Sequence, residues 1–142
     1  RGTSVPVRTM RLVVDASVAI SAALSDVGFG ALDHHELTAP ALLWSEVISA
    51  LSELEWRDEI SQPLARLARD RFLEAPISRR VTLDLYRRAT VVAQQLGWAK
   101  TYDAEYIALA SMLEAPLVTR DGRLHRGARR LVEVLGPDEV AR

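Results

Sequence analysis

The sequence contains no cysteine among its 142 residues. Disulfides, thiolate metal sites and catalysis by a thiol are therefore excluded. Lysine is nearly missing too, because Lys100 is the only lysine among 18 basic residues, and schemes that need several lysines are excluded. No apolar run approaches the roughly 20 residues that span a bilayer, so we expect no membrane association. The first ten residues lack the apolar segment of a secretory signal, and we expect a cytoplasmic protein.

The charge and the length narrow the class of protein further. A formal net charge of −1 gives no overall attraction to nucleic acid, so any such attraction must come from a local patch. The length suits one domain that buries a real core, and 49% hydrophobic with 26% charged residues is typical of a globular protein. We expect a single domain over residues 10–142, with residues 1–9 as a leader or disordered arm.

Apolar spacing predicts an alternation of strands and helices. Short buried strands are predicted at 11–14, 77–81, 117–119 and 131–135, and helices at 16–24, 40–56, 61–75, 83–96 and 102–114, with a short helix after 122. Residues 25–38 are interpreted as a surface loop, and the residues after 136 as a polar tail. Apolar strands separated by helices indicate a parallel sheet covered on both faces, which is an α/β fold.

Two acidic residues follow the predicted strands. Asp15 comes directly after Leu12-Val13-Val14, and Asp121 lies two residues beyond the strand at 117–119. Ligands of α/β sheets bind outside the carboxyl ends of the strands. If the two strands are near neighbours, both carboxylates face one crevice.

Two further acids lie on the apolar faces of predicted helices. With about 100° per residue, Glu46 falls within the apolar sector of its helix, and Asp103 is central to the apolar stripe of the later helix. By the same test Glu105 and Asp84 face solvent. A carboxylate on an apolar face needs a compensating partner, proton or metal ion.

Each of the four acids also has a local explanation. Asp15 suits the N-cap of the following helix, and Asp121 begins an Asp-Gly turn. Asp103 lies in a first helical turn, where the macrodipole favours an acid, and Glu46 suits pairing with an arginine. Taken together, two acids that break the apolar pattern and two at strand ends favour one shared acidic site.

A shared acidic site points to a hard divalent cation. Clustered carboxylates raise each other's pKa, and a cation removes that penalty. Oxygen ligands suit Mg²⁺ or Mn²⁺, which activates water and stabilises phosphoryl charge in metal-dependent nucleases. One ion and two are equally compatible with the sequence. Ser17 and Thr119, each two residues from an acid, suit either local capping or a supporting role toward a carboxylate or a water.

Basic residues cluster around the last acid. Arg120 and Arg123 flank Asp121, and arginine grips phosphate with a planar fork, so these two are candidate RNA-binding residues. Three more arginines follow, at positions 126, 129 and 130, and we interpret them as a solvated helix face. The three tryptophans, Trp44, Trp56 and Trp98, are interpreted as core or interface residues rather than as base-stacking platforms.

Four segments carry a resemblance to a known family. They are Val13-Val14-Asp15-Ala16-Ser17, residues 39–47 (APALLWSEV), residues 101–110 (TYDAEYIALA) and Leu117-Val118-Thr119-Arg120-Asp121. In order and spacing, from about Met10 to Leu135, the chain resembles PIN-domain ribonucleases, and among them the VapC-type toxins of bacterial toxin–antitoxin pairs. The third segment is the most specific.

The resemblance implies a three-layer α/β/α sandwich and a Mg²⁺- or Mn²⁺-dependent endoribonuclease. By position, Asp15, Glu46, Asp103 and Asp121 match the family's acidic metal site, and Thr119 matches its frequent hydroxyl position. It further implies a homodimer, a cognate VapB-type antitoxin and a tRNA or rRNA substrate.

Two other functions remain open at this stage. One is a non-catalytic PIN-like module that binds RNA or a partner, against which the four acids argue. The other is a phosphoacceptor receiver domain, which needs a lysine after a late strand, whereas Lys100 precedes a predicted helix. The RNA target, the cleavage position, the antitoxin and the dimer surface are not determined by the sequence.

Overall fold

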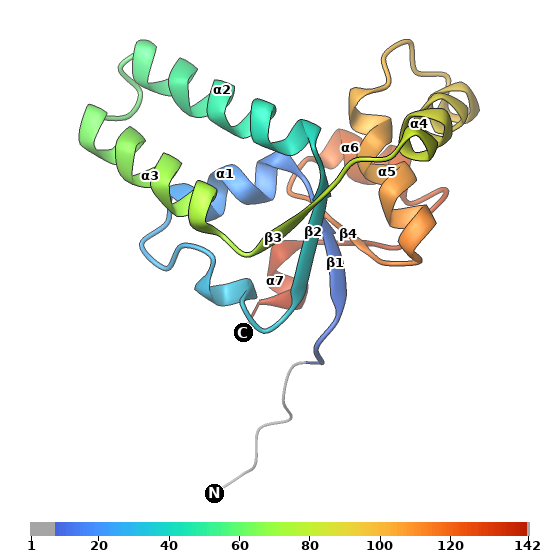
Figure 1. Ribbon diagram of the computed structural model, residues 1–142, viewed down its shortest axis with the longest axis horizontal. Helices are drawn as coiled ribbons and strands as arrows, with labels where there is room; N and C mark the ends of the chain where they lie inside the picture. The colour runs from blue at the N-terminus through green and yellow to red at the C-terminus, as the bar shows by residue number, and fades with distance from the viewer. Residues whose placement is uncertain (1–7, 142) are drawn as a thin grey trace, which may run out of the picture.

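The computed structural model describes residues 8–141, and its centre is one five-stranded sheet (Figure 1). The strands are β1 (Arg11–Val14), β2 (Glu36–Pro40), β3 (Ile77–Arg80), β4 (Leu117–Val118) and β5 (Val134–Leu135). They lie in the order β3-β2-β1-β4-β5, and every pair is parallel. The first seven residues of the predicted leader lie outside the described residues, and Arg8 and Thr9 are exposed without regular structure.

Helices cover the sheet on both faces. They are α1 (Ala16–Leu24), α2 (Leu42–Trp56), α3 (Gln62–Glu74), α4 (Leu83–Leu96), α5 (Tyr102–Leu113), α6 (Gly122–Ala128) and α7 (Pro137–Val140), with a 3₁₀ turn at Gly30–Leu32. Helices α1, α2 and α3 pack together on one side, and α4 and α5 on the other (Figure 1). This is the expected α/β/α sandwich, and its sheet is fully parallel rather than mainly parallel.

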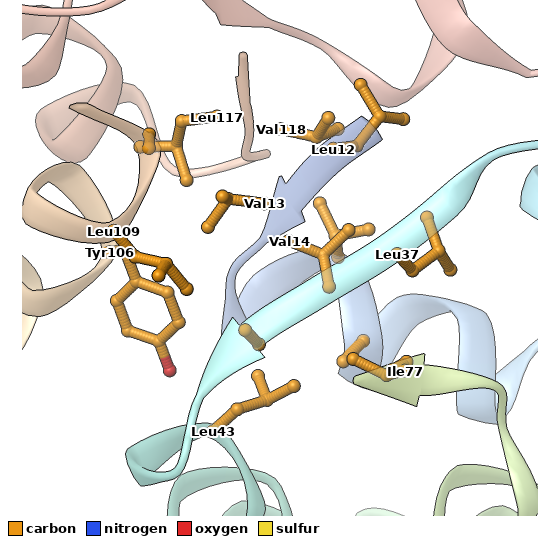
Figure 2. Packing of buried hydrophobic residues seen from close by; sticks show 14 of the residues in the cluster. Leu12, Val13, Val14, Leu37, Leu43, Ile77, Tyr106, Leu109, Leu117 and Val118 are labelled. Carbon is orange, nitrogen blue, oxygen red and sulfur yellow. The ribbon is translucent and has the colours of Figure 1, made fainter. Parts of the chain in front are cut away.

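The core forms on both sides of β1. Successive side chains of a strand point to opposite faces, and Figure 2 shows Val13 directed toward Tyr106 and Leu109 of α5, with Val14 directed the other way, toward Leu37. Val13, Val14 and Leu37 are each at most 2% exposed. A central strand buried on both faces explains why residues 11–14 are an apolar run instead of an alternating one.

Two segments differ from the sequence-based expectation. Residues 25–38 were expected to form a loop, and Pro40 to open a helix; instead Glu36–Pro40 is strand β2. This strand has few apolar residues and ends in proline, which is tolerated because Ala41 takes over hydrogen bonding to Arg80 of β3. The expected polar tail contains helix α7, whose Val140 is fully buried.

A histidine connects the start of the sheet with the end of the chain. His35, 7% exposed, accepts a hydrogen bond at Nδ1 from the Met10 backbone (3.0 Å) and donates from Nε2 to the Val140 carbonyl (2.7 Å). These roles require the neutral imidazole with its proton on Nε2. The residue therefore fastens α7 to the beginning of β1. In residues 8–141 no helix has both the length and the apolar character needed to cross a membrane.

Candidate active site

The two acids that follow strands lie at the same edge of the sheet. Strands β1 and β4 are neighbours, with Val14 paired to Val118, so their carboxyl ends meet. Asp15 then caps α1, accepting a hydrogen bond from Val18 N–H (3.1 Å), and Asp121 caps α6 in the same way through Arg123 and Leu124. The capping explanation is therefore correct for Asp15, whereas Asp121, expected to begin an Asp-Gly turn, is also an N-cap. In both acids the cap coexists with a position at a strand end.

Asp15 is held rigidly from three sides. Besides the Val18 amide, Ser17 donates to Oδ1 (2.7 Å) and Thr119 donates to Oδ2. Ser17 also accepts from the Arg120 backbone (2.9 Å), which ties the β1 and β4 loops together. Of the two roles that the sequence left open for Ser17 and Thr119, the structure shows both hydroxyls fixing the Asp15 carboxylate.

The two helical acids, Glu46 on α2 and Asp103 on α5, line one crevice. Glu46 on α2 accepts a hydrogen bond from the hydroxyl of Tyr106, which reaches across from α5. Figure 2 shows the Tyr106 ring beside the sheet with its hydroxyl directed toward the start of α2. Asp103 lies one turn before Tyr106 on the same helix face and is half-buried. Tyr106 was not singled out from the sequence, although its i+3 spacing from Asp103 was a usable signal.

Electrostatic interactions link the four acids in a closed ring. Asp121 raises the pKa of Asp15 and of Asp103, while Asp103 and Asp15 both raise the pKa of Glu46. In each of these three groups burial is the larger cause of the raised pKa. Hydrogen bonds to Asp15 and Glu46, and the Arg123 charge near Asp103, act in the opposite direction. The structure thus brings all four predicted acids together around one crevice.

Glu105 contradicts the helical-wheel prediction. It was expected to face solvent, but it is only 7% exposed, and burial together with the Glu46 charge raises its pKa. The wheel assumed one buried face, whereas residues 104–110 of α5 are buried all round because α5 lies between the sheet and α4. Asp84, in contrast, is exposed as predicted and pairs with Arg87.

The two candidate RNA-binding arginines flank the acids. Both are exposed, and Arg120 donates to Ser21 Oγ (2.9 Å). The Arg123 guanidinium lies over the Trp98 ring, 5.9 Å from its centroid, and its charge lowers the pKa of Asp103. Positive charge therefore stands at the mouth of the crevice and next to one of its acids.

The donor set fits a hard cation. Four carboxylates, two hydroxyls and no sulfur ligand suit Mg²⁺ or Mn²⁺. Across residues 8–141 no three acidic or histidine side chains are placed to ligate one ion directly. Mg²⁺ usually keeps several of its waters and is bound through one or two carboxylates.

Comparison with known proteins identifies the family of the chain. A family model described as PIN domain matches residues 12–130. The chain belongs to the PIN-domain family. This PIN domain is 36% identical over 114 residues to Ribonuclease VapC9 of Mycobacterium tuberculosis, covering 80% of this chain and 87% of that protein. It is 35% identical over 125 residues to Ribonuclease VapC1 of the same species, covering 79% and 86%.

Solved structures share the fold of this PIN domain. PAE2754 from Pyrobaculum aerophilum superposes with a TM-score of 0.69 at 21% identity, over 92% of this chain and 93% of that one. VapBC2 from Rickettsia felis, bound to a DNA fragment from its promoter, gives a TM-score of 0.64 at 13% identity, over 89% and 98%. At these identities the likeness establishes the three-layer architecture alone.

Proposed function

We propose that this PIN domain is a Mg²⁺- or Mn²⁺-dependent endoribonuclease that acts as the toxin of a VapBC-type pair. The observation that carries the proposal is the ring of four carboxylates, with Asp15 and Asp121 at the strand ends and Glu46 and Asp103 on the adjoining helices α2 and α5. The relatives named as VapC ribonucleases support RNA as the substrate. A tRNA or rRNA target and a cytoplasmic location accord with that role.

The chain's own residues prepare the site for phosphodiester hydrolysis. A bound divalent cation supplies an activated water and stabilises negative charge on the phosphoryl group. Asp15, fixed by Ser17 and Thr119, and Glu46, fixed by Tyr106, present carboxylate oxygens of defined orientation. Asp103 and Asp121 add the charge that attracts the cation, while Arg123 offers a planar fork to the substrate phosphate.

Protein partners form a second part of the proposal. The solved structures with this fold include VapBC complexes from Rickettsia felis and Haemophilus influenzae, which supports a VapB-type antitoxin for this chain. One face of α2 forms a shallow, open surface with Trp44 and Trp56 at its two ends, and Trp56 is 84% exposed. Exposed apolar surface of this kind supports a protein contact, including a homodimer.

The decisive experiment is cleavage of cellular RNA by purified, antitoxin-free protein with and without Mg²⁺ or Mn²⁺. We expect wild-type protein to cut RNA only with the cation, and Asp103→Asn to lose at least about 100-fold in rate because a ring member loses its charge. Asp84→Asn is the matched control, since this exposed acid lies outside the crevice. RNA binding without cleavage would favour the non-catalytic module, and equal activity of Asp103→Asn would remove the acidic ring from the mechanism.

A further inference from the structure

A second cavity adjoins the acidic crevice and differs from it in chemistry. It has a volume of 540 Å³, and its lining combines an acidic wall, Glu46 and Asp103, with aromatic and cationic side chains, Trp98, Lys100, Tyr102 and Arg123. The volume lies within the roughly 300–1,000 Å³ of small-ligand sites. Because two of the four acids form one wall, a group that fills this cavity sits directly beside the reacting phosphodiester.

The cationic wall is built on a fixed aromatic support. Gly97 ends α4 with a positive φ of 72°, which turns the chain so that Trp98 packs against α6. The contact is so close that a Cβ at Gly127 would lie 2.5 Å from the Trp98 ring. Arg123 extends over this ring at 5.9 Å, so the guanidinium is held at the cavity by a cation–π contact.

The remaining wall offers one free aromatic ring and a second cation. Tyr102, the residue before Asp103, is 56% exposed. Lys100, the single lysine of the sequence, lines the same cavity two residues earlier and is exposed. An exposed aromatic ring beside two cations is the combination that binds single-stranded nucleic acid, because bases stack on the ring and cations hold phosphates.

We propose that this cavity is a subsite for one unpaired nucleotide next to the scissile phosphate, with Tyr102 stacking on the base and Lys100 and Arg123 holding the flanking phosphate. The inference rests on the proposed ribonuclease function and adds Tyr102 as a residue that selects the substrate. Trp98 is then a positioning residue that acts through Arg123. A base reaches Tyr102 only when it is unpaired, so the preferred RNA segment is single-stranded.

The first test measures RNA binding without catalysis. Fluorescence anisotropy of a labelled single-stranded RNA oligonucleotide in EDTA compares wild type with Tyr102→Ala and Tyr102→Phe. We expect Tyr102→Ala to weaken binding about tenfold, the effect of losing one stacked base, and Tyr102→Phe to bind almost normally. Tyr86→Ala is the matched control, because Tyr86 is also exposed, at 44%, but lies on α4 outside the cavity. Equal affinity of the Tyr102→Ala and Tyr86→Ala variants would overturn the subsite.

The cation is tested through salt dependence. Lys100→Gln is expected to reduce the slope of log affinity against log salt by about 0.7, the value for one phosphate contact on a single strand. Arg88→Gln, an exposed cation on α4, serves as its control and leaves the slope unchanged. If both variants change the slope equally, the lysine contributes only general charge and its place in the subsite is wrong.

The third test locates the base by cleavage. Abasic nucleotides are placed one at a time around the cut site of a cleaved oligonucleotide, and kcat/KM is measured for wild type and Tyr102→Ala. At one position next to the cut, the abasic nucleotide should reduce kcat/KM about tenfold for wild type. The same abasic nucleotide should have almost no further effect on kcat/KM of Tyr102→Ala. If the abasic nucleotide lowers kcat/KM of Tyr102→Ala as much as that of wild type, the stacking contact is overturned. If neither wild type nor the Tyr102→Ala variant cleaves RNA, the proposed function fails. The binding test in EDTA still shows whether Tyr102 contributes to a nucleotide subsite.

Discussion

The buried carboxylate of Glu105 is the residue whose environment most needs explanation. The residue is 7% exposed, and within residues 8–141 no hydrogen bond or ion pair reaches its carboxylate. A raised folded-state pKa means that Glu105 favours stability below its unfolded pKa of 4.5 and loses that contribution as the pH rises through the folded value. We therefore expect Glu105→Gln to stabilise the protein at pH 7.5 by about 1 kcal/mol.

Urea denaturation in EDTA at pH 7.5 and at pH 4 measures this effect. The advantage of Glu105→Gln should shrink at the lower pH, where the wild-type carboxyl is mostly protonated in both states. Asp84→Asn, which changes an exposed acid, should alter stability by less than about 0.5 kcal/mol at both values. A Glu105→Gln variant less stable than wild type at pH 7.5 would show that the carboxylate has a favourable partner.

The positions of individual acids show which placements can be predicted from the sequence and which cannot. Glu46 was correctly placed toward the crevice because α2 has one buried face, and periodicity describes such a helix well. Glu105 was misplaced because α5 is covered on nearly all sides, which depends on the packing of α4 and not on the sequence of α5. The Tyr106 contact to Glu46 required the distance between two helices, which no local pattern contains.

At the scale of elements, α6 depends on a glycine for its position against the α4–α5 connection. Alanine normally favours a helix over glycine by about 1 kcal/mol. Here Gly127→Ala would place a Cβ 2.5 Å from Trp98, so the ring must move. We expect the variant to be destabilised by about 1–3 kcal/mol, as for an overpacked site, and to lose the native near-UV circular dichroism of the tryptophan.

A matched change identifies the cause of that loss. Gly127→Ala combined with Trp98→Leu removes the ring that collides, so the double variant should recover part of the stability that the glycine substitution removes from wild type. A gain in stability for Gly127→Ala alone would mean that the ring moves aside at no cost.

The helices and strands differ in how clearly the sequence predicts them. Helices α1 and α4 have the bounds that apolar spacing predicts, 16–24 and 83–96. Asp15 and Thr82 cap their starts by accepting amide hydrogen bonds, and Gly97 ends α4 in the left-handed conformation. Strand β2 was missed because its residues, Glu-Leu-Thr-Ala-Pro, have a weak strand pattern. Its place between β1 and β3 is fixed by tertiary pairing instead.

For the whole molecule, the acidic ring couples stability to pH and to cations. Because burial and mutual repulsion raise the pKa of Asp15, Glu46 and Asp103, their contribution to stability is largest below the ordinary carboxyl values of 3.8 and 4.5 and is lost as the pH rises. We expect Mg²⁺ or Mn²⁺ to raise the melting temperature, more at pH 7.5 than at pH 5. The gain is about 2.7 kcal/mol at 100 times the Kd.

Asp15→Asn tests the coupling without removing the helix cap, because asparagine caps as well as aspartate does. Its melting temperature should respond less to the cation and less to pH than that of wild type, while Asp84→Asn behaves like wild type. Differential scanning calorimetry over both pH values and both cation conditions makes the comparison. An unchanged cation response in Asp15→Asn would exclude this carboxylate from cation binding.

The position of β1 in the sheet has a consequence for synthesis of the protein. Its partner β4 comes about a hundred residues later, as the contact between Thr119 and Asp15, 104 positions apart, makes plain. Pairing across so long a separation is a late event in folding, and on a ribosome it awaits the emergence of β4. The four carboxylates therefore come together only after the chain through Asp121 has emerged, so a shorter nascent chain lacks the acidic ring.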